Sequence, residues 1–251
     1  MSPHSLQKNQ STQPVEAAVK LDSNKKNESK QNRKKSPDPN NSNNDNMASI
    51  RRILVIGLGN PGAQYRDTYH SVGHNVLNGL QKLISAEQPA FTSERHGKKA
   101  TLASVGPKYS LIHSPAIMNV SGPWVAKTYR EHLVDLGLQP GELGVVLVHD
   151  DLEEDLGVVK LRTWARSHRG HNGVKSVNAS LQVAQDLTAK WGRISIGIGR
   201  PSERDKSTVA DFVLSKMSKH TKDVLEEKGS RGVLSALLEL EGKNRKLEEG
   251  S

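Results

Sequence analysis

An apolar run that ends in a glycine-rich turn constrains this chain more than any other stretch. Residues 53–56, Ile-Leu-Val-Ile, form an unbroken, largely β-branched run, which is typical of a strand buried on both faces of a sheet. The next six residues, Gly57-Leu58-Gly59-Asn60-Pro61-Gly62, force a turn. Ligands of open α/β sheets bind where the strands end. Asn60 in the turn and His70 shortly after it are therefore candidate site residues.

Residues 1–49 differ in composition from the rest of the 251-residue chain. They contain hardly any large apolar side chains and are rich in Asn, Ser, Lys, Gln and Pro. Such a segment buries too little apolar surface to offset the entropy lost on folding. The sequence therefore predicts a disordered, polar and basic tail over residues 1–49 and one folded, catalytic domain over residues 50–251.

The chain carries a net charge of +9 and has no cysteine. The charge favours a polyanionic partner, nucleic acid above all, although a solvated basic surface has the same composition. The lack of cysteine excludes disulfides and thiolate chemistry. No apolar run approaches the ~20 residues of a membrane span, and the N-terminus has no secretory core. We expect a cytoplasmic protein that does not bind membranes, with mitochondrial import as the alternative.

Strands and helices alternate along the folded part. Besides residues 53–56, strands are expected at 99–106, 109–113, 143–148, 158–162 and 193–199, helices at 72–85, 174–187 and 219–240 and after Ser121 as N-cap, and a connector at 209–214. Such alternation is typical of helices packed on a mainly parallel sheet. The predicted fold class is α/β, a single-domain three-layer sandwich around a twisted, mostly parallel (mixed) sheet.

Two familiar site types fit the sequence poorly. The turn matches the dinucleotide-binding pattern Gly57-x-Gly59-x-x-Gly62, but Pro61 and a polar stretch delay the helix that should begin at the glycines. A metal site could be formed by His149-Asp150-Asp151 with His168-x-x-His171. Arginines flank these imidazoles, however, and suit an anion better than a cation.

A third hypothesis pairs His70 with Asp150. Asp150 follows the apolar strand at 143–148, and side chains at the ends of neighbouring parallel strands meet at one edge of the sheet. A carboxylate bound to one imidazole nitrogen raises the basicity of the other, which can then take a proton from water. Three amides in glycine-rich or serine-rich loops, Asn60, Asn119 and Asn172, could orient an ester, a ribose and that water.

Five motifs in this order resemble the bacterial-type peptidyl-tRNA hydrolases: GLGNPGAQYRDTYHSVG, IMNVSG, VHDDL, RGHNGVKSV and RISIGIGRP. The resemblance runs from about Ile53 to Leu214. It implies an enzyme that hydrolyses the ester between a peptide and the terminal ribose of tRNA, which recycles tRNA from aborted translation. It also implies a single α/β globule that acts as a monomer on peptidyl-tRNA, with no metal and no cofactor.

The resemblance also implies roles for single residues. His70 would be the general base, and Asp150 would hold it in its basic form. Asn60 would help to distinguish peptidyl-tRNA from aminoacyl-tRNA with a free amine. The remaining matched positions would contact the substrate: Tyr65 and Arg162 the tRNA, Asn119 and Asn172 the substrate and water, and Ile117 the substrate through its backbone alone.

The chain departs from the family pattern mainly at positions expected to contact tRNA. Ser71 replaces an asparagine, Ile117 an aromatic residue and Ser195 a phosphate-gripping arginine, for which Arg193 or Arg200 could substitute. Residues 163–167, Thr-Trp-Ala-Arg-Ser, replace glycines and lengthen the loop by one residue. A non-catalytic RNA-binding protein on the same fold is the rival interpretation. The presence of His70, Asp150 and the three asparagines favours the enzyme.

Overall fold

The computed structural model describes residues 50–183 and 190–249. The tail predicted for residues 1–49 lies outside the described residues, as does the end of the helix predicted for residues 174–187. No helix in the described ranges is both long and apolar enough to cross a lipid bilayer.

Seven strands form one mixed sheet in the order β2-β3-β4-β1-β5-β7-β6. Their bounds are β1 Arg52–Gly57, β2 Thr92–His96, β3 Lys99–Val105, β4 Tyr109–His113, β5 Leu143–Asp151, β6 Val159–Arg162 and β7 Lys190–Gly197. The central strands β4, β1, β5 and β7 are parallel, whereas β2, β3 and β6 pair antiparallel with their neighbours. The predicted single α/β domain with a mixed sheet is confirmed.

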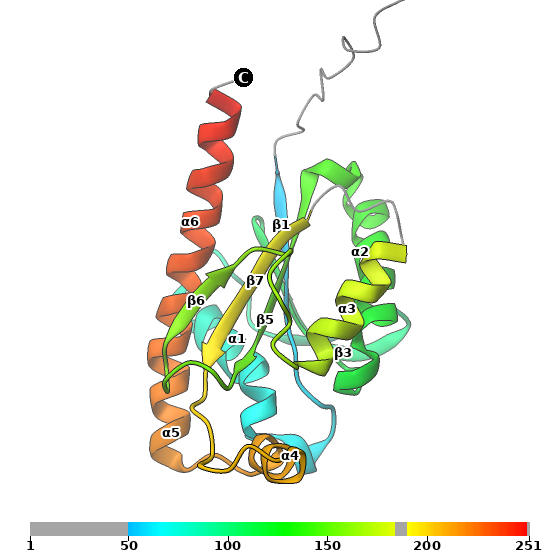
Figure 1. Ribbon diagram of the computed structural model, residues 1–251. Helices are drawn as coiled ribbons and strands as arrows, with labels where there is room; N and C mark the ends of the chain where they lie inside the picture. Colours follow the sequence, from blue (N-terminus) through cyan, green and yellow to red (C-terminus); the bar gives the residue numbers. More distant parts are fainter. Residues whose placement is uncertain (1–49, 184–189, 250–251) are drawn as a thin grey trace, which may run out of the picture. The chain divides into compact units, whose positions relative to one another are not determined.

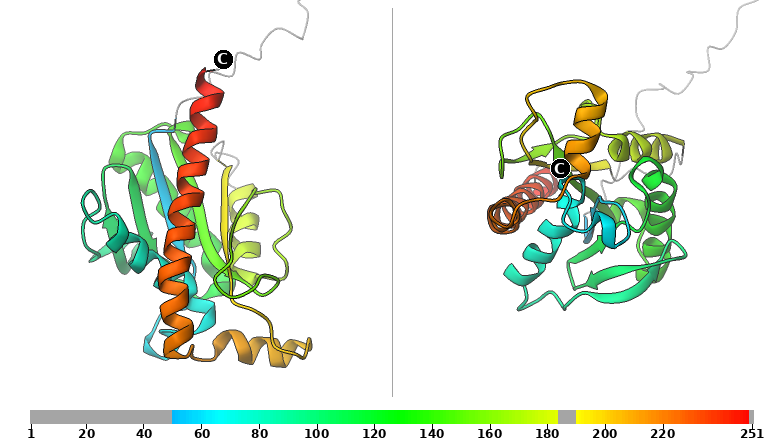
Figure 2. Two further views of the ribbon diagram at one scale, coloured as in Figure 1. Left: turned by 90° about the vertical axis from the view of Figure 1, so that its left-hand side faces the viewer. Right: turned by 90° about the horizontal axis from the view of Figure 1, so that it is seen from below.

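Helices cover both faces of the sheet (Figures 1 and 2). Their bounds are α1 Val72–Leu83, α2 Ser121–Leu136, α3 Asn172–Val183, α4 Lys206–Leu214, α5 Lys219–Val224 and α6 Ser230–Glu249. Strand β1 contributes side chains to the hydrophobic cores on both faces of the sheet, because successive side chains of a strand point to opposite faces. Ile53 and Val55 pack with α1 and α6, and Leu54 and Ile56 pack with α2 and α3. This burial on both sides explains the unbroken apolar run.

Four sequence-based expectations need correction. The connector predicted at 209–214 belongs to α4, which Asp205 caps by accepting hydrogen bonds from the backbone N–H groups of Ser207 and Thr208. Ser121 is not an N-cap, since its hydroxyl donates to Met118 O. Strand β2 was not expected, because its residues are mostly exposed and polar. The C-terminal helix is interrupted by a π-helical turn at Leu225–Gly229.

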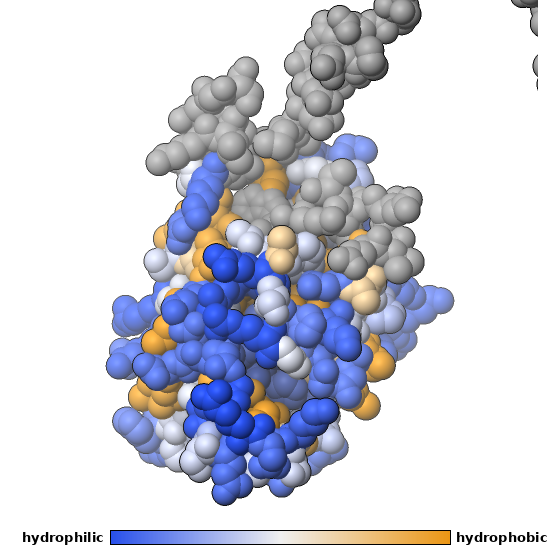
Figure 3. All heavy atoms as spheres, in the orientation of Figure 1, coloured by the Kyte–Doolittle hydropathy of each residue, from blue (hydrophilic) through white to orange (hydrophobic). Residues whose placement is uncertain are grey.

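Strand β5 extends further than expected, and this extension matters for the site. It includes His149, Asp150 and Asp151, which pair with Ser195, Ile196 and Gly197 of β7. The loop after β6 and the segment that leads to α4 lie at the same end of the sheet, where the most hydrophilic residues of this face gather (Figures 1 and 3). Asp150 is therefore held by a sheet rather than by a loop.

Close backbone packing brings the start of α1 against the ends of β1 and β5. A Cβ atom on Gly73 would lie 2.5 Å from Leu58 O and 2.6 Å from Val148 O. A Cβ on Gly57 would lie 2.6 Å from Gly73 O. Backbone atoms cannot move aside as a flexible side chain can. Glycine at positions 57 and 73 therefore allows the segment that precedes α1 to lie next to β5.

We predict that Gly73→Ala destabilises the protein by about 1–3 kcal/mol, because the added methyl group must push α1 away from two backbone carbonyls. Gly242→Ala in α6 is the matched control, since nothing lies within 4 Å of a Cβ built there. Alanine should stabilise that helix slightly. Urea unfolding measures both changes. Equal unfolding free energies for the two variants would contradict the packing argument.

Candidate active site

His70 lies in a short 3-10 turn, Tyr69–Ser71, directly before α1. The turn is fastened to the segment between α4 and α5: Tyr69 N–H donates to Ser215 O, and Met217 N–H donates to Asp67 O. Asp67 has a left-handed backbone (φ 60°), and its carboxylate accepts from Asn75 and pairs with Lys222 at 3.1 Å. Contacts on both sides therefore fix the position of His70.

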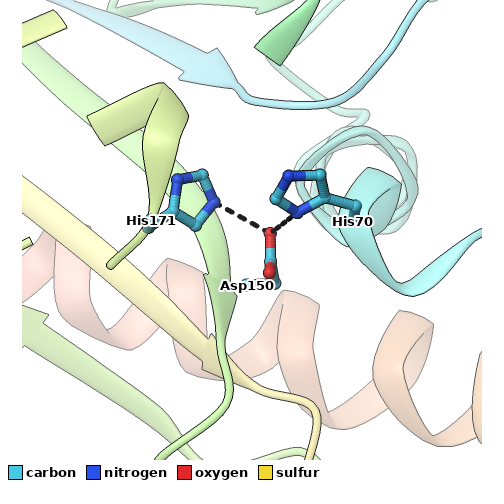
Figure 4. A group of neighbouring side chains, drawn as sticks. All are labelled: His70, Asp150 and His171. Atoms are coloured by element: carbon cyan, nitrogen blue, oxygen red, sulfur yellow. Dashed lines mark hydrogen bonds and ion pairs between the residues drawn. The ribbon is translucent and has the colours of Figure 1, made fainter. Parts of the chain in front are cut away.

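Asp150 Oδ1 lies between two imidazoles (Figure 4). It is 2.9 Å from His70 Nδ1 and 2.9 Å from His171 Nε2. Because a carboxylate only accepts hydrogen bonds, both nitrogens carry protons. His171 Nδ1 accepts from Val174 N–H, which holds this ring in its neutral form. In His70 the bond at Nδ1 leaves Nε2 as the atom that can accept a proton.

The surroundings of the pair favour a basic His70. Burial opposes a charge on the His70 ring, but the charge of Asp150 and its hydrogen bond outweigh this effect and raise the pKa of His70 above its usual value. Burial alone would raise the pKa of Asp150. Interaction with His70 and His171 instead keeps the pKa of Asp150 well below its usual range. Asp150 is therefore ionised at neutral pH.

A third imidazole borders this group but stays neutral. The ring centroid of His149 lies 4.8 Å from that of His171. Burial is the main cause that lowers the pKa of His149 to about 3. His149 Nδ1 bonds to Asp150 O, and its buried Nε2 has no partner among the described residues. His149 is therefore neutral at neutral pH and does not take up a proton there.

The structure also bears on the two site types that fitted the sequence poorly. His70, Asp150 and His171 offer three potential ligand atoms within 4.8 Å of one another. Both ring nitrogens are directed at Asp150 Oδ1 itself, however, and the short N–H···O bonds leave no space for an ion between them. At the glycine-rich turn, 3-10 turns separate β1 from α1. Helix α1 therefore does not begin at the glycines, as the dinucleotide-binding pattern requires.

A cavity of about 870 Å³ opens above the histidines. Its lining includes His70, Asp150 and all three predicted asparagines. Asn60 Oδ1 accepts from Met118 N–H at 2.8 Å, which leaves the Asn60 amide N–H groups as donors to the cavity. Asn119 and Asn172 are exposed on its wall. The residues proposed for the chemistry are thus brought together from β5, from the loops after β1 and β4, and from the start of α3.

The predicted substrate contacts have different positions. Ile117 lines the cavity and is 59% exposed. Arg162 also lines it, and its guanidinium contacts Asp151, Glu154 and Ser195. Tyr65 is half-buried and is not part of the cavity lining.

The arginines suggested as substitutes for the missing cation at position 195 are both engaged. Arg193 is almost fully buried and donates to the carbonyls of Arg166 and Ser167, so it supports the loop after β6 from beneath. Arg200 pairs with Glu153.

Sequence reasoning missed two features of the site. It treated His171 only as a potential metal ligand, although His171 is the second hydrogen-bond donor to Asp150. It considered Arg169 only as one of the arginines that suit an anion, and it missed that Arg169 contacts Asp151 and Glu154 from a left-handed backbone conformation (φ 47°). Both residues lie in the loop after β6, and no local pattern predicts the path of that loop. The one available signal for His171 was its position directly before the cavity amide Asn172, in the tripeptide HNG.

Comparison with known proteins supports this description. The family model "Peptidyl-tRNA hydrolase" matches residues 54–247. A peptidyl-tRNA hydrolase of Anaeromyxobacter sp. (strain K) is 39% identical over 167 residues, which cover 66% of this chain and 78% of that protein. A probable peptidyl-tRNA hydrolase of Schizosaccharomyces pombe is 33% identical over 175 residues, which cover 69% and 75% of the two chains.

A solved structure has the same fold. The crystal structure of peptidyl-tRNA hydrolase from Acinetobacter baumannii matches with a TM-score of 0.59 over 79% of this chain and 93% of that chain, at 23% sequence identity. The fold alone would not establish the family, but the match to the family model and the two relatives do. This chain belongs to the peptidyl-tRNA hydrolase family.

Proposed function

We propose that His70 is the general base with which this protein carries out the reaction of its family, hydrolysis of the ester between peptide and tRNA. The observation that carries the proposal is the hydrogen bond from His70 Nδ1 to the buried, ionised Asp150 beside a large cavity. It leaves His70 Nε2 free to accept a proton from water. We assign this catalytic domain to residues 50–251.

The reaction uses one base and several amide donors. His70 Nε2 takes a proton from water, and the hydroxide attacks the ester carbonyl. Amide N–H groups of the asparagines, with Asn60 the best placed by its bond to Met118, stabilise the negative charge that develops on the carbonyl oxygen. The ester C–O bond then breaks, and the ribose oxygen takes the proton from His70. Asp150 stabilises the imidazolium that exists between the two transfers.

The same amide offers a basis for selecting peptidyl-tRNA. Because Asn60 Oδ1 is engaged by Met118, the side chain presents N–H donors to the substrate. The peptide bond next to the ester offers a carbonyl acceptor to such donors. An aminoacyl-tRNA has an ammonium group there, which offers none. A free amine should therefore be bound less well than a blocked one.

The remaining assignments concern the context of the reaction. We infer that the protein acts as a monomer, because one chain supplies the base, its partner and the amides. The hydrogen bonding of the histidine group supports a reaction without metal or cofactor. The cytoplasm is the proposed location, with the mitochondrion as the alternative, since both compartments carry out translation.

We predict that His70→Ala lowers kcat by about 10²–10⁴-fold, the usual contribution of a positioned base. The measurement is release of tRNA from N-acetyl-aminoacyl-tRNA, with free-amine aminoacyl-tRNA as the control substrate. Circular dichroism checks that the variant is folded. Cleavage by the folded variant at the wild-type rate would refute the mechanism. Tight, salt-sensitive tRNA binding by a wild-type protein that cleaves neither substrate would instead support the RNA-binding interpretation.

A second prediction concerns pH. Since Asp150 raises the pKa of His70 above 6.5, wild-type kcat/KM should increase through that raised pKa and then level off, because only the neutral ring accepts a proton. In Asp150→Asn, burial alone acts on His70, so the inflection should move to lower pH while the plateau falls. A pH–rate profile of both proteins measures the shift. An unmoved inflection would mean that the titrating group is not His70 paired with Asp150.

A further inference from the structure

Two stacked histidines lie against the glycine-rich turn that carries Asn60. His74 in α1 and His113 at the end of β4 have ring centroids 4.6 Å apart and an angle of 5° between their planes. The ring of His74 also packs against Gly59. A Cβ atom built on Gly59 would lie 2.6 Å from Cε1 of this ring and 2.8 Å from each of the two ring nitrogens. The imidazole therefore fills the space that a side chain at position 59 would need.

The contact with His74 accounts for glycine at position 59. The φ angle of Gly59 is not positive, so a left-handed backbone is not the reason for glycine here. The three atoms nearest to the added Cβ all belong to the His74 ring. The turn and the ring are thus packed so closely that a displacement of either one moves the other.

The His74 ring also lies where two loops of the site begin. It makes hydrogen-bonding contacts with the backbone of Gly57, at the end of β1, and of Ser114, directly after β4. These two residues are joined as well, because Ser114 N–H donates to Gly57 O at 2.9 Å. Further along the same two loops, Met118 N–H donates to Asn60 Oδ1. A shift of His74 would therefore reach both partners of the hydrogen bond that orients Asn60.

The stacked pair is neutral and lies outside the cavity. Burial lowers the pKa of His74 to about 4 and holds the pKa of His113 well below its usual value. The Nε2 atoms of both rings are buried and have no hydrogen-bond partner among the described residues. Phe91 packs on His113, with ring centroids 4.8 Å apart. Neither histidine is among the described residues that line the cavity, so an effect of the pair on the reaction must pass through residues that do.

We propose that His74, supported by His113, is a positioning residue that fixes the glycine-rich turn and thereby the direction in which the Asn60 amide meets the substrate. The proposal rests on the proposed function, which assigns to Asn60 the selection of a blocked amine. Direction matters because a hydrogen bond weakens steeply as it departs from linearity. Selectivity for peptidyl-tRNA thus depends on a residue that does not touch the substrate.

The test measures kcat/KM for N-acetyl-aminoacyl-tRNA and for free-amine aminoacyl-tRNA in the wild type, His74→Ala and Gly59→Ala. The first variant removes the support of the turn, and the second forces a methyl group against the ring. Each should lower the ratio of the blocked to the free-amine value about three- to tenfold, which is the usual contribution of one hydrogen bond. A ratio that stays at the wild-type value in His74→Ala would overturn the proposal.

A double variant shows whether the two residues act through their contact. In Gly59→Ala/His74→Ala the added methyl group enters space that the ring has left. The double variant should therefore lose no more selectivity than His74→Ala alone. Losses that add up would contradict the contact and overturn the proposal.

His132→Ala is the matched control for the loss of a buried histidine. His132 in α2 also packs against a second histidine, His96, with ring centroids 5.1 Å apart, and neither of them is among the described residues that line the cavity. The control should be less stable than the wild type and keep the wild-type selectivity. Thermal melting verifies that each variant is folded. An equal loss of selectivity in His132→Ala would indicate a general effect of destabilisation and overturn the proposal.

The pH–rate profile separates an effect on Asn60 from an effect on the proposed base. His74→Ala should keep the inflection of the wild type, because His70 and Asp150 remain in place. A shifted inflection would mean that the substitution acts through His70, and the proposal would be wrong.

A measurement without hydrolysis separates failure of this proposal from failure of the proposed function. The side-chain amide signals of Asn60 in NMR spectra are assigned by their loss in Asn60→Asp. They should shift in His74→Ala and stay in place in His132→Ala. A wild-type protein that cleaves neither substrate would refute the proposed function, whereas unshifted Asn60 signals in His74→Ala would refute the positioning role.

Discussion

The hydrogen bond between His70 and Asp150 joins segments 80 residues apart, and the geometry around it depends on how two backbones approach. Glycine at positions 57 and 73 lets the start of α1 lie against β1 and β5, and pairing with β7 carries β5 past the end of β1. Neither feature involves a side chain of the site. In the proposed mechanism, the fold contributes by fixing the distance between the base and its carboxylate before substrate arrives, as effective catalysis requires.

The cavity combines two electrostatic environments. Around Asp150, burial and hydrogen bonding keep His149 and His171 neutral, so that one ring, His70, gains the capacity to take up a proton. Toward β6 and the loop after it, arginines and lysine outnumber the carboxylates that they contact. A substrate with an ester at one end and a polyanionic strand at the other matches this division. The net charge of the chain alone could not indicate this division of the cavity into two electrostatic environments.

The sequence predicted those structural features that one short segment determines. The run at 53–56 and the apolar strand before Asp150 predicted the sheet centre, and with it the meeting of His70 and Asp150. The sequence was less informative about features that depend on packing between segments far apart in the chain. Arg193 looked available for substrate, but it is buried beneath the loop after β6. Helix α4 could have been predicted, because Asp205 is a recognisable N-cap. The role of His171 could not, because it depends on the path of a loop.

The attachment of the His70 turn to the segment between α4 and α5 has a consequence for how this protein is made. Lys216 donates to Arg66 O across 150 positions of sequence, and Lys222 pairs with Asp67. While the ribosome is still adding residues, the nascent chain is itself a peptide esterified to tRNA, the type of bond that the finished domain cleaves. The contacts that fix the position of His70, the proposed base, form only after nearly all of the domain has been synthesised. A nascent domain that still lacks residues 215–222 therefore lacks the contacts that hold the His70 turn in place.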